Sequence, residues 1–314
     1  MKRANITVLG GGTGLSVLLR GLKQFPVDIS AIVTVADDGG SSGRLREELQ
    51  IPPPGDVRNV LVALSEVEPL VEELFQHRFT NGSGLHGHSL GNLLLAGMSS
   101  ITGDFAQGVQ EISRVLNVKG KVIPASNSHL TLVAEMEDGR VIRGESKIPE
   151  AGGKIHRVHL EPEHPRAMGE ALQSIEQADL IVLGPGSLYT SIIPNLLVPG
   201  MKEALFASNA PKLYICNVMT QPGETDGYSV GDHIQAIHDH LGAPVVDHVL
   251  LNTQEIPEGF AEKYEEEGAY YVEVDEERLE KMGIHVIAED LLTITENLLR
   301  HDAMKVSRRL VSLL

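Results

Sequence analysis

Residues 5–14 read Asn-Ile-Thr-Val-Leu-Gly-Gly-Gly-Thr-Gly, and this stretch decides the fold class. A short β-branched strand over residues 5–9 runs directly into a glycine-rich turn, and residues 15–23 then have helical spacing. Glycine lets the backbone approach a ligand closely, and the first amides of a helix attract anions. Strand, turn and helix in this order predict an α/β unit with a phosphate site at its first turn.

Apolar runs and helical patterns alternate along most of the remaining chain. Nearly continuous apolar runs, typical of strands buried on both faces of a parallel sheet, occupy residues 28–36, 179–183, 212–217 and 245–251. Helical patterns cover residues 57–65, 70–79, 89–101, 105–116, 167–177, 231–241 and 303–314, with Asp56, Ser89, Asp104 and Asp302 as candidate caps. The sequence therefore predicts a Rossmann-like, doubly wound, mostly parallel α/β sheet.

The middle of the chain interrupts this rhythm. Residues 130–136 and 140–146 are short strand patterns around Asp138-Gly139, a strong hairpin signal, and residues 155–160 can add a third strand. We expect a single α/β domain over residues 1–314 with a β-rich insertion near residues 127–160. This insertion is the best candidate for a small subdomain or a lid.

Composition limits the classes of partner. The chain has 314 residues, of which 42% are hydrophobic, and its formal charge is −17. A field of that sign repels nucleic-acid backbones and anionic lipid, so neither is expected as a partner. Cys216 is the one cysteine, which excludes a disulfide framework, and no apolar run is long enough for a membrane helix. With no targeting segment visible, we expect a cytoplasmic protein.

The first glycine-rich turn supplies four candidate ligand-binding residues: Gly11, Gly12, Thr13 and Gly14. Backbone amides and the Thr13 hydroxyl suit phosphate or diphosphate. The turn is not the standard dinucleotide fingerprint, because the third required glycine would fall on Leu15 or Val17. A tight turn used for packing alone is the alternative.

A second polar segment, Asp-Asp-Gly-Gly-Ser-Ser-Gly-Arg-Leu-Arg, follows the second strand at residues 37–46. Ligands of open α/β sheets bind at that edge. Asp37 and Asp38 suit ribose hydroxyls or Mg²⁺, although neighbouring residues of a strand point to opposite faces. Ser41, Ser42 and Arg44 complete the candidates, Arg44 because its planar fork matches phosphate. A solvated loop with surface ion pairs is the alternative.

Residues 85–94 carry a third segment, Leu-His-Gly-His-Ser-Leu-Gly-Asn-Leu-Leu. We interpret His88 and Asn92 as ligand-facing polar groups. Two histidines without a nearby acid are weak evidence for a metal site, so no metal ligand is assigned. A capped core helix explains the leucines of this segment but leaves His86-Gly87-His88 unexplained.

Two later strands also end in polar turns. Residues 184–191 repeat the glycine-rich pattern and offer Gly186 and Ser187, with Asn195 one to two helical turns further on, while Leu188, Ile192 and Leu196 fit a core stripe. Asn217, Thr220 and Gln221 follow the strand that carries Cys216, which we interpret as an inert buried thiol. Arg300, near the end of the chain, can reach the same edge of the sheet. The alternative is that Asp302 caps the last helix and that Arg300 is only an exposed neighbour of this cap. Two such turns in one sheet indicate a ligand with two separated polar parts.

No catalytic signature accompanies these segments. The His-Glu-x-x-His motif and the Walker pattern are absent from the sequence, and the bare Gly-x-Ser-x-Gly spacing at residues 39–43 and 87–91 does not by itself mark a nucleophile. We therefore assign no catalytic residue.

Taken together, the turns at residues 10–14, 36–46, 87–92, 184–191 and 217–225 resemble those of the bacterial YvcK proteins, the gluconeogenesis factors. These are relatives of CofD, the phospholactate transferase of deazaflavin-coenzyme synthesis. The motifs are specific as a set and run in one order through the whole chain.

The resemblance implies a CofD-like fold, a role in cell shape and in growth on gluconeogenic carbon sources, and a UDP-sugar ligand such as UDP-N-acetylglucosamine. Thr13 falls in the nucleotide loop of the family, and Asn195 and Arg300 match positions associated with the UDP-sugar site. Regulation without turnover is the favoured hypothesis, and a CofD-like transferase using Mg²⁺ is the rival. The sequence leaves open which regulatory protein partner binds and whether the chain forms a homodimer.

Overall fold

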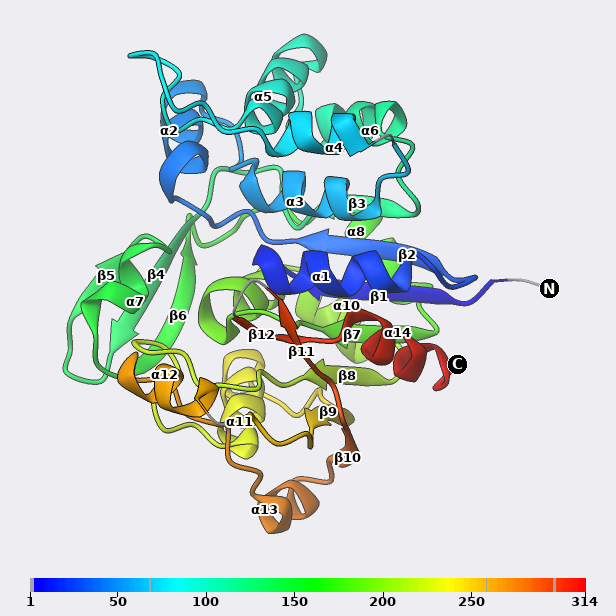
Figure 1. Ribbon diagram of the computed structural model, residues 1–314, viewed down its shortest axis with the longest axis vertical. Coiled ribbons are helices and arrows are strands. Elements are labelled where there is room, and N and C mark those ends of the chain that lie inside the picture. The colour runs from blue at the N-terminus through cyan, green and yellow to red at the C-terminus, as the bar shows by residue number, and fades with distance from the viewer. Residues whose placement is uncertain (1–2, 68, 258, 296–297) are drawn as a thin grey trace.

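Seven strands pair in parallel to form the central sheet (Figure 1). The structure is a computed structural model that describes residues 3–67, 69–257, 259–295 and 298–314. In spatial order the strands are β10 (His285–Glu289), β9 (His248–Asn252), β8 (Lys212–Ile215), β7 (Leu180–Leu183), β1 (Asn5–Gly10), β2 (Asp28–Val33) and β3 (Lys121–Pro124). The predicted doubly wound, mostly parallel α/β sheet is confirmed.

The strand order reverses at β1. The chain runs from β1 outward through β2 to β3, then crosses back to place β7 on the other side of β1 and continues outward to β10. Open α/β sheets bind ligands in the crevice that such a reversal leaves at the carboxyl ends of the strands. That crevice lies beyond Gly10 and Leu183.

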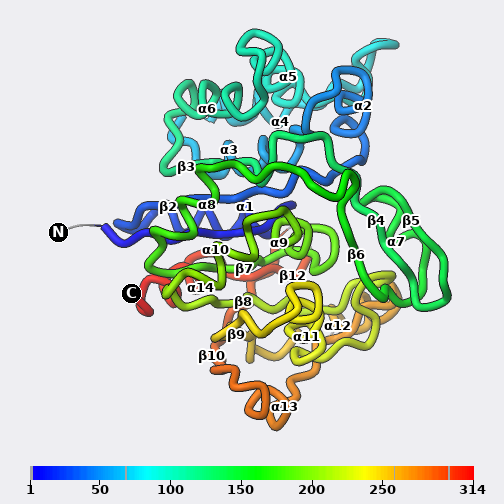
Figure 2. Tube along the Cα trace, turned by 180° about the vertical axis from the view of Figure 1, so that it is seen from behind, coloured from blue at the N-terminus to red at the C-terminus, as the bar shows by residue number. Residues whose placement is uncertain are grey.

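Helices cover both faces of the sheet, as Figures 1 and 2 show from opposite sides. One buried cluster joins Ile6 and Val8 to helices α1 (Gly12–Leu22), α3 (Gly55–Leu64) and α14 (Ala303–Val311). The other joins Leu9 to helices α8 (Gly169–Glu176), α9 (Ile193–Leu196), α10 (Met201–Ala207) and α11 (Val230–Leu241). Because neighbouring strand residues point to opposite faces, one short strand supplies both cores.

Three of the four predicted helix caps are confirmed. The side chains of Ser89, Asp104 and Asp302 accept hydrogen bonds from the first-turn amides of α5 (Leu90–Thr102), α6 (Phe105–Val115) and α14. Asp56 is not a cap, because α3 begins one residue earlier, after Pro54. Its carboxyl group lies in the first turn of α3 and accepts a hydrogen bond from the Gly12 amide of the first glycine-rich loop.

The predicted insertion is an antiparallel sheet in the order β5 (Val141–Arg143), β4 (Thr131–Met136) and β6 (Ile155–Glu161), with helix α7 (Lys147–Ala151) between β5 and β6. The Asp138-Gly139 hairpin is confirmed, since the Met136 amide donates to the Arg140 carbonyl. Figure 1 places this sheet beside the end of the central sheet toward which β2 runs. Its apolar residues continue the same buried cluster that contains Leu9.

Several elements escaped the sequence patterns. These are helices α2 (Gly40–Leu49), α10, α12 (Phe260–Glu266) and α13 (Glu276–Lys281), and strands β3, β10, β11 (Leu292–Thr295) and β12 (Leu298–His301). Helix α4 (Pro69–Gln76) ends earlier than predicted, because residues 77–79 turn to bond with the segment before α5. No described helix combines the length and apolar composition that a membrane span needs.

Candidate functional site

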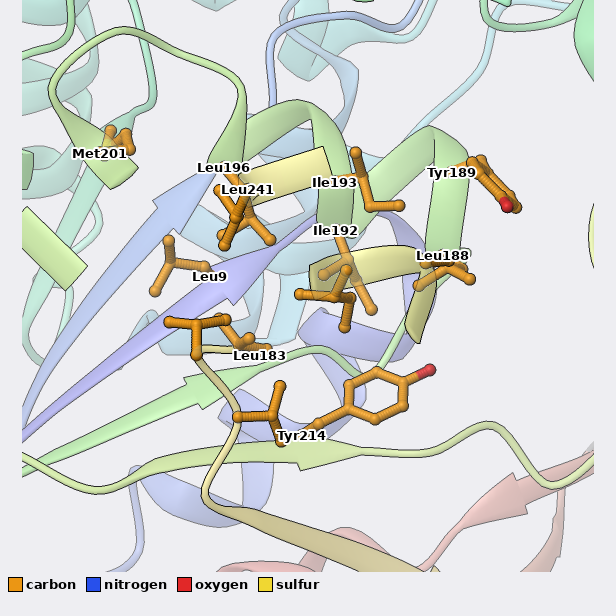
Figure 3. Close-up of a cluster of buried hydrophobic side chains, with 14 of the residues drawn as sticks. Leu9, Leu183, Leu188, Tyr189, Ile192, Ile193, Leu196, Met201, Tyr214 and Leu241 are labelled. Atoms are coloured by element: carbon orange, nitrogen blue, oxygen red, sulfur yellow. The ribbon is translucent and has the colours of Figure 1, made fainter. Parts of the chain in front are cut away.

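A π-helical turn over Leu188–Ile192, followed by α9, fixes the second glycine-rich loop above the sheet (Figure 3). Leu188, Ile192 and Leu196 are buried against the strands, as the core interpretation predicted. These anchors hold the backbone of residues 184–187 next to the end of β1. The loop is therefore positioned by packing before any ligand arrives.

A cavity of about 630 Å³ opens at the carboxyl ends of β1, β7 and β8, where the strand order reverses. This volume falls in the range of small-molecule sites. Ten of the predicted site residues line it: Gly11, Gly12, Thr13, Gly14, Gly186, Ser187, Asn217, Thr220, Gln221 and Arg300. The structure thus brings together the loops after three different strands.

The two glycine-rich loops touch each other backbone to backbone. A Cβ atom placed on Gly14 would lie 3.1 Å from the carbonyl oxygen of Pro185. Gly11 precedes the first turn of α1, and Gly12, Thr13 and Gly14 of that turn line the cavity together with the second glycine-rich loop. The start of a helix in a cavity wall is a favourable place for an anion.

Asn195 joins the same two loops from behind. Its side-chain amide nitrogen donates to the carbonyl oxygens of Gly10, at 3.0 Å, and Ser191, at 2.8 Å. The residue is fully buried and does not line the cavity. The structure places Asn195 as a brace behind the wall, and its predicted contact with a ligand stays a prediction.

A hydrogen-bonded chain of side chains forms the polar wall. The Asn217 amide nitrogen donates to the Gly186 carbonyl at 3.0 Å and to the Gln221 amide oxygen at 3.2 Å. Gln221 in turn donates to the Ser187 hydroxyl at 2.8 Å. The wall is therefore ordered across the loops after β7 and β8.

The other predicted residues do not line this cavity. Three of them, Ser41, His88 and Asn92, meet each other between α2 and α5: the Ser41 hydroxyl lies 3.0 Å from His88 Nδ1 and accepts from the Asn92 amide at 3.2 Å. All three are buried, and burial lowers the pKa of His88. Nearby, Ser42 is buried and Arg44 donates to the His86 carbonyl at 2.8 Å. Contact of this group with a ligand stays a prediction.

Asp37 and Asp38 turn to different partners. Asp37 accepts a hydrogen bond from the Gly39 amide at 2.9 Å, whereas Asp38 accepts one from the Ser146 amide of the insertion, also at 2.9 Å. The buried guanidinium of Arg46 donates to the carbonyls of Ala36 and Asp37 and fixes the end of this segment. Asp38 therefore ties the insertion to the sheet edge.

Three further carboxyl groups surround the site and were missed from the sequence. Burial, together with the negative charge of Asp37, raises the pKa of Asp56 to about 7 and that of Glu145 to about 8, and burial raises the pKa of Glu224 to about 7. The Gly12 amide also bonds to Asp56. Glu145 and Glu224 line the cavity, and no sequence signal separated them from the chain's many surface acids.

The opposite wall comes from β12 and α14. Arg300 and His301 line the cavity there, and burial lowers the pKa of His301 to about 4, so its ring is neutral at pH 7. Cys216 is buried as predicted, and burial raises the pKa of its thiol to about 12. Within the described part of the chain, no group of three or more His, Cys, Asp or Glu side chains is arranged to hold a metal.

The family model of 2-phospho-L-lactate transferase CofD matches residues 6–292 of the chain. The chain belongs to the CofD family. Within that family it is 62% identical over 311 residues to a gluconeogenesis factor of Halalkalibacterium halodurans, covering 99% of this chain and 97% of the relative. It is 59% identical over 313 residues to the gluconeogenesis factor of Bacillus subtilis, covering 100% and 99%.

A crystal structure of a Bacillus halodurans protein matches this CofD-family chain with a TM-score of 0.97. The two share 62% sequence identity, and the match covers 99% of this chain and 100% of the other. The resemblance to the gluconeogenesis factors, predicted from five turns, is confirmed. Three of those turns line the CofD-family cavity, while the turns at residues 36–46 and 87–92 bond to each other.

Proposed function

We propose that this CofD-family protein is a cytoplasmic regulator that binds a UDP-sugar, such as UDP-N-acetylglucosamine, and supports cell shape and growth on gluconeogenic carbon sources. The observation that carries the proposal is the cavity at the strand-order reversal, walled by two glycine-rich loops and a polar chain of side chains. The loops suit the diphosphate, and the polar wall suits the sugar or base. The relatives from Halalkalibacterium halodurans and Bacillus subtilis are named gluconeogenesis factors, which supports the gluconeogenic role.

One ligand should occupy the cavity. The loops after β1, β7 and β8 line a single volume of about 630 Å³ rather than separate clefts. Asn195 and Asn217 connect these loops through hydrogen bonds, so a displacement of one loop should displace the loops bonded to it. We expect one-to-one binding of a UDP-sugar.

Mg²⁺ fits the charge of this site. Among the described residues that line the cavity, Arg300 is the one arginine or lysine, and the ring of His301 is neutral at pH 7, so a bound diphosphate would lack positive countercharge. Mg²⁺ often binds through one or two carboxylates plus ligand phosphates, so a three-residue cluster is not required. Asp56, which accepts a hydrogen bond from the amide of the cavity-lining Gly12, and the neighbouring Asp37 would hold the ion at the edge of the cavity, where it would supply this countercharge.

A CofD-like transferase is the second candidate, favoured by the matching family model. Such an enzyme needs a group that stabilises a leaving phosphate or activates an acceptor. The carboxyl groups of Asp37, Asp56 and Glu145 are close enough to influence one another and could serve that purpose. The regulator proposal instead assigns them to holding the ligand.

One experiment separates the two functions. The protein is incubated with UDP-N-acetylglucosamine and Mg²⁺, and uridine species are followed by chromatography, while calorimetry measures binding. We expect saturable one-to-one binding with the UDP-sugar recovered intact. Steady release of UDP or UMP that is lost in an Asp37→Asn variant would favour the transferase, and absence of binding would end the proposal.

A further inference from the structure

Helix α5 has no Asp, Glu, Lys or Arg in its 13 positions, although 22% of the whole chain is charged. Its inner side packs inside the protein through Gly91, Asn92, Leu95, Ala96 and Ser99, which are all buried. Figures 1 and 2 both place the helix at the outer end of the molecule, beyond α3. A helix that is apolar on all sides is normally covered on all sides, so the outward side of α5 calls for a partner.

The outward side of α5 is a stripe of four residues that are not buried: Leu90, Leu94, Gly97 and Ile101. They are spaced four, three and four positions apart, which lines them up along one side of the helix. The same spacing marks the seam at which two helices pack side by side. At 80%, Ile101 is the most exposed large hydrophobic side chain of the described residues. The single chain therefore displays one half of a helix pair.

The stripe fits an inverted copy of itself. When two α5 helices pack antiparallel about a two-fold axis between Leu94 and Gly97, Leu90 lies opposite the partner's Ile101 and Leu94 lies opposite the partner's Gly97. Gly97 is a notch in the stripe, because no atom lies within 4 Å of the place that its Cβ would take. The Leu94 side chain can fill that notch, and the two-fold axis repeats the contact. Shape therefore favours a second copy of this chain as the partner.

The charges at the two ends of α5 favour the same arrangement. Arg78 is exposed and pairs through its backbone with Ser89, the residue just before the helix. Asp104 lies two residues after the end of the helix. In an antiparallel pair, Arg78 lies beside the end of the other helix, where the partner's Asp104 and the negative end of the helix dipole attract it. The uncharged stripe also lets two chains of charge −17 meet with little repulsion.

We propose that two copies of this chain form a homodimer through the α5 stripe, with the two helices antiparallel. A membrane surface fits the stripe less well, because helices that lie on membranes carry Lys and Arg on their polar side, and α5 has neither. One helix face is small beside the roughly 800 Å² that each partner buries in a standard interface. We therefore expect a reversible dimer whose fraction rises with protein concentration.

The substitution Gly97→Leu separates the dimer from the fold. In the single chain the new side chain enters open space, and leucine favours a helix more than glycine does, so the melting temperature should hold or rise. In the dimer it meets the partner's Leu94 twice, and we expect the dissociation constant to rise about 100-fold. Gly169→Leu is the matched control, because Gly169 is exposed at the start of α8 and also has open space around it. Sedimentation equilibrium should find the control as dimeric as wild type.

Mixing two variants tests the register of the pair. Leu94→Ala leaves both notches empty and should weaken the dimer, whereas Gly97→Leu overfills them. In a mixed dimer, the leucine of the Gly97→Leu chain lies opposite the alanine of the other chain, and the native Leu94 lies opposite the native Gly97. We expect the two variants to pair with each other more tightly than either pairs with itself. Sedimentation with one fluorescently labelled variant measures this, and equal affinities would overturn the proposed register.

Ile101→Lys adds a charge at the end of the stripe, with Val115→Lys as its control. Val115 is also exposed but lies at the far end of α6 from Ile101. We expect only the Ile101 variant to be monomeric. A wild-type chain that stays monomeric at its highest soluble concentration overturns the proposal, and its sedimentation with phosphatidylglycerol vesicles would assign the stripe to lipid instead. A dimer that survives both Gly97→Leu and Ile101→Lys also overturns it. Binding of a UDP-sugar is a separate matter, because no residue of α5 lines the cavity.

Discussion

Two hydroxyl-rich segments follow strands of the same sheet but use their polar groups differently. After β7, Ser187 lies in the cavity wall and bonds to Gln221 of another loop. After β2, Ser41 lies inside the start of α2 and bonds to His88 and Asn92 of the segment that leads into α5. The segment after β7 forms part of the cavity wall, whereas the segment after β2 holds α2 against the start of α5.

The difference shows how a polar residue in a glycine-rich segment should be assigned. Where its hydrogen-bonding groups are paired inside the protein, as at Ser41, the residue stabilises the fold. Where its segment lines the cavity, as at Ser187, the residue is a candidate for contact with a ligand. Residue type alone does not separate these two cases.

The largest expected effect comes from Gly12→Val. Gly12 has φ of +65°, which a β-branched residue adopts only with strain, and it lies in the loop that lines the cavity. Gly139→Val is the control, because Gly139 also has positive φ but lies in the exposed hairpin. We expect both to lower the free energy of unfolding by about 1–3 kcal/mol. Only Gly12→Val should raise Kd, by about 100-fold in calorimetry; equal Kd values would remove the phosphate role of this loop.

Next in size is Asn195→Ala. It removes the two hydrogen bonds that hold the Gly10 and Ser191 carbonyls together. We expect the free energy of unfolding to fall by about 2 kcal/mol and Kd for the UDP-sugar to rise about tenfold, because both loops shift. Denaturant unfolding and calorimetry measure the two. Weaker binding at full stability would instead show direct contact with the ligand.

His88→Ala tests the other side of the comparison. It leaves the buried Ser41 hydroxyl without one of its partners, so we expect a loss of about 1–2 kcal/mol in the free energy of unfolding. Kd should change by less than about twofold, since His88 does not line the cavity. A large rise in Kd with an unchanged melting temperature would restore His88 as a ligand contact.

Thr13→Val keeps the shape of an exposed side chain in the cavity wall and removes its hydroxyl. We expect binding to weaken by about 1 kcal/mol, the usual net value of one hydrogen bond. Stability should not change, because no bond inside the protein is lost. If calorimetry finds the same Kd, the loop holds its ligand through backbone amides alone.

The smallest expected effect concerns Glu145→Gln in the insertion. Burial and neighbouring acids raise the pKa of Glu145 to about 8 in the folded protein, above its ordinary value of 4.5. Its contribution to stability is therefore fully present below about pH 4.5 and is lost as pH rises through 8. We expect the variant to match wild type near pH 5 and to be more stable near pH 9, by up to about 1 kcal/mol. Equal unfolding curves at both pH values would place Glu145 outside the acidic surroundings described here.

Periodicity and capping residues predicted much of the fold. Continuous apolar runs identified β1, β2, β7, β8 and β9, because strands buried on both faces leave no polar positions. Ser89, Asp104 and Asp302 marked three helix starts correctly. The insertion was predicted from its Asp138-Gly139 turn and its alternating strands.

The missed elements were formed by tertiary contacts. Helix α2 begins with Gly-Ser-Ser-Gly, a poor helical sequence, and is held by the bonds of Ser41 and Arg46 to other elements. Strand β3 has four residues and ends in proline, so it has no periodicity to detect. The cavity loops were predicted because they follow strands. The cavity-lining carboxyl groups of Glu145 and Glu224 were not, because the burial of a side chain is a property of three-dimensional packing.

Because the strand order reverses at β1, the cavity is lined by residues from both halves of the polypeptide. Its floor pairs the loop after β1 with a loop that begins more than 170 residues later, and Asn195 bonds across that separation. A ligand seated there can bind only the fully assembled sheet, and binding to the native state alone raises its stability by mass action. A sugar nucleotide bound there would therefore stabilise the contact between the two halves of the sheet, by an amount that grows with its free concentration.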